Sequence, residues 1–401
     1  MRNRMKKVLL LLLFIFVSIS FIGCWDYFEI DKRGYVLGIA IDLATEADLE
    51  EAKLQSIIPE SGMPLYVFTI QLPIIANAKQ KPGSQGGSGP PSDRVWNLKI
   101  LANSLFEAQR EFSTRLDFQP FFEHLKVIVI SEDAARKGIS TPLDFLIRDH
   151  EMRRRTKVFV TPGTAYSILQ VTPKIEDYSA LYLRSLPENA SKTSRMPHIT
   201  DLGVVSERLH TDIDFALPKI ISSREEIKSV GGAVFKKDKM VGWMNELQMN
   251  YLKWVDNIVK GGTITISAFS NEEKIIALEL CKVKTNVKPI VKGDNITFII
   301  ESNANANITE IGYKHGKEVF DDDFIKKVQS AAAEKVANGM RQTIKTVQND
   351  FGTDLFFFYR TLQRYAPDTW DKVQSNWSEI FPNVNTEINV NIKIEHIGTK
   401  K

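Results

Sequence analysis

The chain has 401 residues, of which 25% are charged and 43% hydrophobic, a globular composition with enough length for two or three domains. Four of its 52 basic residues lie within the first ten positions, and residues 24–401 contain 48 basic and 49 acidic side chains. This balance excludes a strongly basic chain of the kind that binds nucleic acids through its net charge.

The first 23 residues have the layout of a secretory signal peptide. The basic stretch MRNRMKK precedes apolar to small residues at 8–22, and Gly23 comes directly before Cys24. These 15 residues are fewer than the roughly 20 that a membrane-spanning helix needs, and Asp26 and Glu29 follow at once. We therefore expect cleavage before Cys24 and export of the remaining chain, with an uncleaved N-terminal anchor as the alternative.

The two cysteines have different surroundings. Residues 21–24, Phe-Ile-Gly-Cys, resemble a bacterial lipobox, in which the cysteine receives a diacylglycerol, although Phe21 departs from the usual leucine. Two acyl chains hold a protein stably at a bilayer, where one chain is marginal, so Cys24 is the expected lipid anchor. Cys281 lies in the apolar stretch IIALELCKV and is expected to be a buried free thiol.

The N-terminal part begins with two expected strands and a long loop. Residues 33–42 and 65–72 are apolar and rich in β-branched side chains, which is typical of strands. Residues 81–92, KPGSQGGSGPPS, contain too much Gly, Pro and Ser to pack. We interpret them as a loop inside a domain rather than as a linker between domains.

An alternation of helix and strand follows this loop. A helix is expected from apolar residues at three- and four-residue steps, namely Val95, Leu98, Leu101, Leu105, Ala108 and Phe112. Strands are expected at 124–131 and 156–162, with a short helix at 142–148 between them. The pattern predicts a mixed or partly parallel sheet with packed helices in a domain spanning 24–190.

A polar, proline-containing stretch at 184–200 predicts a boundary before a small middle α+β domain at 191–260. Three short strands are expected in it, at 216–221, 227–237 and 239–244. Gly231 and Gly232 predict a bulge, and KKDK predicts a tight hairpin turn. A helix at 245–259 is expected to present Leu247, Tyr251, Trp254 and Ile258.

The last domain, 261–401, is expected to be α+β with helices on one side of an antiparallel sheet. Strands are predicted at 262–269, 274–287, 295–308 and 387–398. A long helix at 322–349 begins after Asp321, where carboxylates suit the helix dipole. Its apolar stripe is Ile325, Val328, Ala332, Val336, Met340, Ile344 and Val347. Two shorter helices follow, and the second begins at Pro367.

No catalytic, metal-binding or cofactor motif is present in the sequence. The six histidines are scattered, and HExxH, G-x-S-x-G, P-loop and G-x-G-x-x-G patterns are all missing. The acidic triplet at 321–323 is read as a solvated helix start rather than a calcium site. We therefore expect no catalytic residue, no bound metal and no cofactor, and the chain is not expected to be an enzyme.

Two stretches are candidate interaction surfaces. Arg148, Arg153, Arg154, Arg155 and Lys157 form a basic cluster that could meet anionic headgroups or an acidic partner. Its alternative is a solvated helix end and loop. LFFFYR at 355–360 could be an exposed aromatic patch or part of the core between helices and sheet.

Several blocks together carry a family resemblance. The segment GCWDYFEIDKRGYVLGIAID resembles the opening of the Ger(x)C family, the lipidated C subunits of spore nutrient-germinant receptors. Later stretches of this chain resemble later blocks of that family in the same order. They are HLKVIVISEDAARKGI with FLIRDHEMRR, then GGAVFKKDKMVGWMNE, and then FGTDLFFFYR with TWDKVQSNW. The resemblance spans almost the whole chain after the signal, with Phe21 and the insertion at 81–92 as departures.

The resemblance implies a three-domain α+β receptor subunit without catalytic activity. Such a subunit is attached through Cys24 to the outer face of the spore inner membrane. It acts with the integral-membrane A and B subunits in the response to amino acids or nucleosides. A lipid-anchored solute-binding protein of a transporter is the alternative, and it requires two similar α/β lobes around a cleft.

Overall fold

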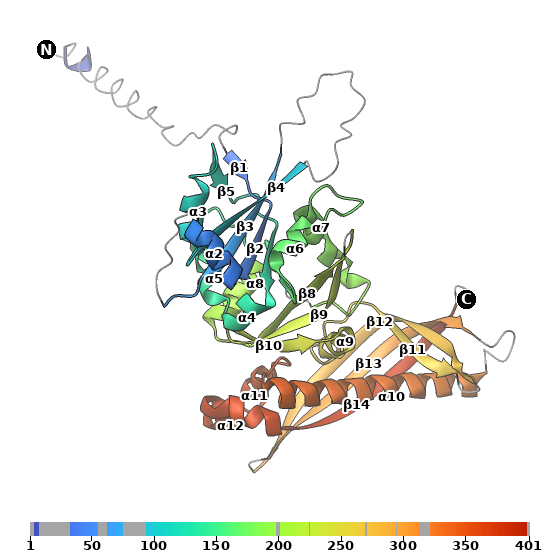
Figure 1. The fold of residues 1–401 in the computed structure, drawn as a ribbon. Coiled ribbons are helices and arrows are strands. Elements are labelled where there is room, and N and C mark those ends of the chain that lie inside the picture. The colour runs from blue at the N-terminus through green and yellow to red at the C-terminus, as the bar shows by residue number, and fades with distance from the viewer. Residues whose placement is uncertain are drawn as a thin grey trace.

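The computed structural model describes residues 4–7, 33–54, 62–74, 94–197, 201–223, 225–268, 271–293, 295–312 and 321–398. Within these ranges the chain forms an eight-stranded sheet, a four-stranded sheet, and a parallel pair of β1 (Arg33–Tyr35) and β5 (Gln119–Phe121). Figure 1 shows the two larger sheets at opposite ends of the body, with α9 (Glu246–Val255) near their junction. Gly23, Cys24 and the 81–92 loop lie outside the described residues.

The eight-stranded sheet is mixed, as expected. Its spatial order is β10 (Lys239–Met244), β9 (Ile227–Lys236), β8 (Phe215–Ser222), β7 (Lys157–Thr161), β6 (Val127–Ser131), β2 (Gly38–Leu43), β3 (Tyr66–Pro73) and β4 (Val95–Ala102). The central strands β8, β7, β6 and β2 pair in parallel, and the outer strands pair antiparallel. Central parallel strands are covered on both faces, which is why β6 is apolar from Val127 to Ile130 and every residue of the strand is buried.

Helices cover both faces of this sheet. Buried side chains of α3 (Leu105–Phe112), α4 (Glu132–Lys137), α5 (Ser140–Arg148) and α8 (Leu202–His210) share one core with Ile39, Ile128 and Ile130. Those of α6 (Ala165–Gln170) and α7 (Ser179–Ser185) share the other core with Val127 and Val129. The helix α2 (Glu46–Leu54) follows β2. The α+β class with mixed sheets and packed helices is confirmed.

The helix expected from Val95 onward is wrong over its first half. Residues Val95–Ala102 form the edge strand β4, which pairs with β3 along its whole length, and the helix begins only at Leu105. Ser104 ends the strand by capping α3, because its side chain accepts a hydrogen bond from the backbone N–H of Glu107. The helical spacing of the apolar residues in this strand is coincidental, and pairing with β3 decides its conformation.

The three strands expected in the middle part are confirmed, with the bulge and the hairpin. Gly231 has a φ of 74° opposite a register shift, and Lys237 has a φ of 56° in the turn between β9 and β10. These strands extend the N-terminal sheet through one β7–β8 pairing, Val160 with Lys219. The N-terminal and middle parts therefore share one sheet, and the boundaries at 190 and 260 stay predictions.

The helix α9 forms, but one residue of its expected apolar face is exposed. Trp254 is fully buried, whereas Leu247 is 57% exposed. The buried side is instead formed by Met249, Leu252, Lys253, Trp254 and Val255. The helix is covered on more than one side, since its buried residues pack with both the middle strands and the C-terminal core.

The four-stranded sheet has the order β11 (Thr263–Ala268), β12 (Asn271–Lys292), β13 (Asn295–Ile311) and β14 (Asn385–Ile397). The expected antiparallel arrangement is wrong for its last pair, because β13 and β14 run parallel. Parallel neighbours need a crossover. Helices supply it, namely α10 (Asp322–Thr346), α11 (Phe358–Tyr365), α12 (Pro367–Val373) and α13 (Trp377–Ile380).

The long helix α10 lies along one face of this sheet (Figure 1). Its expected stripe is confirmed from Val328 to Ile344, but Phe324 rather than Ile325 is the buried residue in its first turn. The aromatic run that follows belongs to the core, since Leu355, Phe356 and Phe358 are buried. The alternative of an exposed patch is therefore wrong for most of this run.

Cys281 is exposed, so its expected burial is wrong. Strand β12 alternates at this point, with Leu278 and Leu280 buried and Glu279 and Cys281 facing solvent. The apolar composition of the segment conceals a strand with one wet face.

Two further observations concern the functional alternatives. The eight-stranded and four-stranded sheets differ in strand number and in connection, so the described parts do not form the two similar lobes that a solute-binding protein needs. Among the residues that the structure describes, no helix is both long enough and apolar enough to cross a bilayer.

Candidate functional site

The structure divides the basic cluster that the sequence predicts. Arg148 ends α5 with its side chain 77% exposed, and its Nε lies 2.8 Å from Oδ1 of Asp144. Arg154 donates a hydrogen bond from Nη2 to the carbonyl oxygen of Gly203 at 2.9 Å. Arg153, Arg155 and Lys157 line one basic cavity, to which Arg148 and Arg154 do not contribute. The cluster is therefore partly a solvated helix end and partly the wall of a site.

This basic cavity has a volume of about 810 Å³ and lies at the amino ends of β6 and β7, opposite α8 and the end of α9. Eight basic and three acidic side chains line it, which leaves a surplus of five positive charges. The acidic side chains are Glu188, Asp201 and Glu207, and the basic ones are Lys126, Arg153, Arg155, Lys157, Arg184, Arg208, Lys253 and Lys260.

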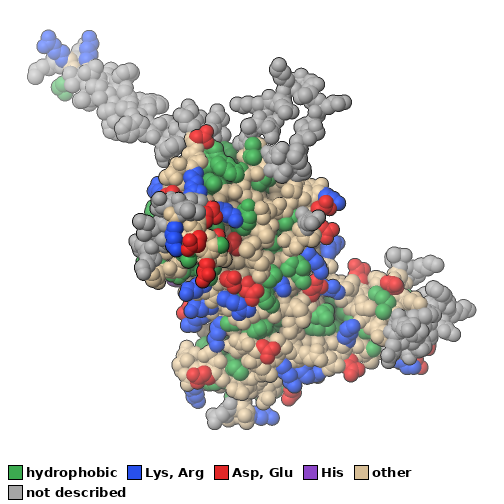
Figure 2. Space-filling model, viewed as in Figure 1, with side chains coloured by type: hydrophobic (Ala, Val, Ile, Leu, Met, Phe, Trp, Pro, Cys, Tyr) green, Lys and Arg blue, Asp and Glu red, His purple; other side chains and the backbone are tan. Residues whose placement is uncertain are grey.

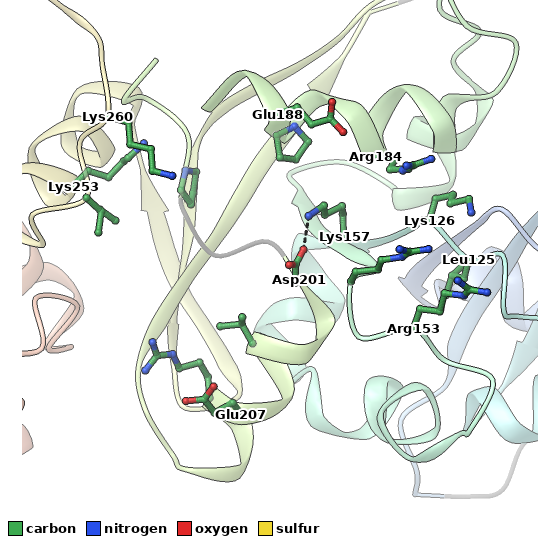
Figure 3. Close-up of a pocket in the computed structure, with 16 residues that line it drawn as sticks. Leu125, Lys126, Arg153, Lys157, Arg184, Glu188, Asp201, Glu207, Lys253 and Lys260 are labelled. Atoms are coloured by element: carbon green, nitrogen blue, oxygen red, sulfur yellow. Dashed lines mark hydrogen bonds and ion pairs between the residues drawn. The ribbon is translucent and has the colours of Figure 1, made fainter. Parts of the chain in front are cut away.

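Five of the eight cations come from outside the predicted cluster. Lys126 precedes β6, Arg184 lies in α7, Arg208 lies in α8, and Lys253 and Lys260 lie in and after α9. Figure 3 shows Lys126, Arg153 and Arg184 gathered on one side of the cavity, with Lys253 and Lys260 on the other. None of the five has another basic residue directly beside it in the sequence, so local composition carries no sign of their convergence.

Few of these cations have an anionic partner. Lys157 forms an ion pair with Asp201, at 2.5 Å between Nζ and Oδ1, and Arg153 lies 3.6 Å from a carboxylate oxygen of Glu123. Within the described ranges, no hydrogen bond or ion pair is made by the side chains of Lys126, Arg155, Arg184, Lys253 or Lys260. Burial, and next the neighbouring arginines beginning with Arg184, lower the pKa of Lys126.

Two of the cations are almost completely buried. Lys253 is 3% exposed, and its burial, followed by the nearby charge of Lys260, lowers its pKa to about 8. Arg208 is 9% exposed, and its Nε and Nη1 have no hydrogen-bond partner among the described residues. Its guanidinium lies 4.8 Å from the centre of the Phe357 ring. Burial lowers the pKa of Arg208 as well. A buried charge without a partner is costly, so Lys253 favours an anion in the cavity.

Arg208 also borders a second, mainly apolar pocket of about 220 Å³. Asp256 lines this pocket, and the desolvation of its carboxyl, followed by the nearby charge of Asp354, raises the pKa of that group well above its usual range. The nearby Asp354 accepts hydrogen bonds from the backbone N–H groups of Phe358 and Tyr359 and from Nε1 of Trp377. Its burial raises its pKa to about 6. Arg208 thus lies between a basic cavity and a region of buried carboxyls.

The remaining site predictions have different outcomes. The lipidation and cleavage residues Cys24 and Gly23 lie outside the described residues. Among those that are described, no group of three His, Cys, Asp or Glu side chains is placed to hold a metal ion.

Figure 2 shows Lys and Arg interspersed with Asp and Glu over the viewed face of the molecule. The basic cavity therefore differs in charge from that face, and its lining suits a molecule with several anionic oxygens.

Two family models match this chain in sequence order. A model described as spore germination protein N-terminal domain matches residues 26–222, and one described as spore germination B3/GerAC like, C-terminal, matches residues 230–398. The chain belongs to the Ger(x)C family. Members of the Ger(x)C family are C subunits of spore germinant receptors.

Ger(x)C relatives match the chain over nearly its full length. The chain is 28% identical over 407 residues to spore germination protein YndF of Bacillus subtilis (strain 168), covering 100% of both chains. It is 23% identical over 391 residues to spore germination protein B3 of the same organism, covering 96% of both. The crystal structure of the GerBC protein has the same fold, with a TM-score of 0.58, 21% identity, and coverage of 89% of this chain and 98% of that one.

Proposed function

We propose that this Ger(x)C protein is the lipid-anchored C subunit of a receptor that starts spore germination in response to nutrients such as amino acids or nucleosides. The observation that carries the proposal is the ordered match of both family models over 26–222 and 230–398. It is supported by relatives that are themselves named spore germination proteins and align over 96% or more of this chain. Deleting the gene should slow nutrient-triggered germination and leave growth unchanged. Normal germination with every nutrient would contradict the proposal.

The attachment point in this proposal is Cys24, on the outer face of the spore inner membrane. The first strand, β1, begins at Arg33, and Figure 1 shows β1 at the end of the body remote from the four-stranded sheet. The nine residues from Cys24 to Arg33 span at most about 30 Å when fully extended. An anchor at Cys24 therefore keeps the end with β1 within about that distance of the bilayer.

A substitution tests the anchor directly. Cys24→Ala should abolish labelling by a radioactive or clickable fatty acid and release the protein from the membrane fraction. Cys281→Ala is the matched control, since this exposed thiol lies in β12 and should leave labelling and location unchanged. Continued membrane attachment of Cys24→Ala would instead assign the anchor to the apolar residues 8–22.

In this proposal the subunit acts by contact with the integral-membrane A and B subunits and not by catalysis. Cross-linking of the assembled receptor, followed by co-purification on this subunit, should recover both partners. Recovery of this subunit without either partner would contradict a shared complex. Calorimetry of the chain with single amino acids and nucleosides separates this role from direct sensing, because tight binding of a nutrient would show that the subunit is more than an interaction component.

A further inference from the structure

We propose that the basic cavity is a binding site for a small molecule with several phosphate-type anionic oxygens, held between the amino ends of β6 and β7 and the α8–α9 side of the fold. Both a free phosphorylated molecule and the headgroup of an anionic phospholipid have this chemistry. The site goes beyond the receptor role, and its failure would leave that role unaffected.

The first argument is the distribution of charge. The full chain carries a formal net charge of only +3, yet a single cavity contains eight basic and three acidic side chains. Lys126, Arg155 and Arg184 face this space without a partner among the described groups, and their charges repel one another. A polyanion in the cavity converts this repulsion into attraction, and the partly enclosed setting screens the interaction less than open solvent does.

The second argument is the burial of a cation that has no partner. Lys253 is more than nine-tenths buried and lines the cavity. Within the described residues its side chain forms no hydrogen bond or ion pair, and the nearest charge that acts on it is the cation of Lys260. Buried polar groups in folded proteins nearly always have a hydrogen-bond partner, so the Lys253 ammonium indicates an acceptor that comes from a ligand.

The third argument is the type and direction of the donors. Arginines from two separate segments, namely Arg153 and Arg155 before β7 and Arg184 in α7, line the same space. Guanidinium forks bind phosphate and carboxylate in a bidentate manner. A tetrahedral phosphate group presents oxygens in several directions at once and can meet donors from opposite walls, which a single planar carboxylate cannot. The arrangement therefore favours phosphate chemistry.

The fourth argument is size. A volume of about 810 Å³ falls within the range of small-molecule pockets, roughly 300–1,000 Å³. The walls come from the β6 and β7 ends, α7, the 3-10 helix Leu186–Ser191, α8 and the segment after α9. A ligand that fills this space contacts both the amino ends of β6 and β7 and the α8–α9 region. Binding should therefore stabilise the packing of these two parts against each other.

Calorimetric titration of the full chain in neutral detergent, with sodium pyrophosphate as the probe, tests the site. We use about 150 mM salt, where charges in open solvent are screened beyond about 8 Å. The exposed pair Arg155→Ala/Arg184→Ala should weaken pyrophosphate binding at least about tenfold without changing the circular dichroism spectrum. Arg155→Lys/Arg184→Lys keeps the charge and should lose less affinity. Lys253→Met keeps the buried stem, removes the charge and should also weaken binding.

Arg148→Ala is the matched control, because Arg148 belongs to the same stretch of sequence, lies outside the cavity and should leave the affinity unchanged within about twofold. The source of the ligand is decided by titration with dihexanoyl phosphatidylglycerol, and with dihexanoyl phosphatidylcholine as its uncharged control, both below their micelle concentrations. Tighter binding of pyrophosphate identifies a free oligoanion, and tighter binding of the phosphatidylglycerol identifies a lipid headgroup.

Three results would overturn the proposal. The first is no measurable binding of either phosphate probe to the unaltered chain. The second is equal binding by the unaltered chain and the folded Arg155→Ala/Arg184→Ala variant. The third is tighter binding of a hexaglutamate peptide than of both phosphate probes, which would assign the cavity to an acidic segment of a protein partner.

Discussion

Gly339→Ala offers a sharp test of how α9 and α10 pack. Gly339 is buried in the middle of α10, and a Cβ added there would lie 2.0, 2.2 and 2.5 Å from three carbons of the Tyr251 ring. Such separations lie far inside van der Waals contact, so the ring or one of the helices must move. Tyr251 is half-buried on α9 and packs against the C-terminal core, which restricts its movement.

Two opposing effects determine the magnitude. Replacing Gly by Ala in a helix interior normally stabilises by about 1 kcal/mol, since alanine loses less backbone entropy on folding. Forcing an extra methyl into a packed interface costs about 1–3 kcal/mol. We therefore expect Gly339→Ala to lower the free energy of unfolding by about 1 kcal/mol. In a Tyr251→Ala background the clash is removed, and the same substitution should raise this free energy by about 1 kcal/mol.

Urea unfolding followed by tryptophan fluorescence measures the four free energies of this double-mutant cycle. The coupling energy between the two sites should be about 2 kcal/mol, because the helix-propensity contribution cancels. Gly163→Ala is the control, since no atom lies within 4 Å of its added Cβ, and it should be nearly neutral. Stabilisation by Gly339→Ala in the otherwise unaltered chain would refute the close packing of these helices.

Three further predictions concern single side chains. Burial raises the pKa of Asp354 to about 6, so the folded state holds its proton more tightly than the unfolded chain and stability falls as pH rises from about 4 to 6. Deprotonation of Asp354 should lower the free energy of unfolding by roughly 1 kcal/mol between pH 5 and 7. Urea unfolding at both pH values should therefore show a smaller loss of stability for Asp354→Asn than for the unaltered chain. An equal loss in the two proteins would contradict the raised pKa. Asp42→Ala should lower the free energy of unfolding by about 1–3 kcal/mol in the same assay. The reason is that the buried carboxylate of Asp42 accepts hydrogen bonds from the backbone N–H groups of Ala165 at 2.6 Å and Tyr166 at 3.0 Å. An unchanged urea midpoint would contradict this prediction. Cys281 should react with a maleimide in the folded chain, because its thiol is exposed. The reaction should be slower than that of a free thiol, because partial desolvation and the charges of Glu279 and Glu395 raise the pKa of Cys281. Labelling only after denaturation would contradict the exposure of this thiol.

Local sequence pattern determined most secondary structure in this protein. The apolar β-branched runs of β2, β6 and β7 and the stripe of α10 were predictable, because strand and helix periodicities follow from the backbone geometry of a few neighbouring residues. The family resemblance was equally accessible, since ordered blocks of residues carry it without reference to three-dimensional contacts. The α+β class followed from the order of these elements.

Pairing with distant strands decided what local pattern could not. Residues 95–102 have helical spacing, yet β3 offers a complete row of backbone hydrogen-bond partners and makes them a strand. The direction of β14 depends on where the helices after β13 return the chain. Cys281 is exposed because only one face of β12 is covered. In each case a contact remote in sequence selects between two locally acceptable structures.

The basic cavity is the clearest product of tertiary structure. The sequence by itself identified Arg153, Arg155 and Lys157 as a charged stretch, with Arg148 and Arg154 as equal members. Only the fold brings Lys126, Arg184, Arg208, Lys253 and Lys260 to the same space and turns Arg148 away from it. Charge is a property of each residue and can be read in a sequence. The distance between charges, which sets their interaction energy, depends on contacts between segments more than 100 residues apart, such as those that place Lys126 and Lys253 around one cavity.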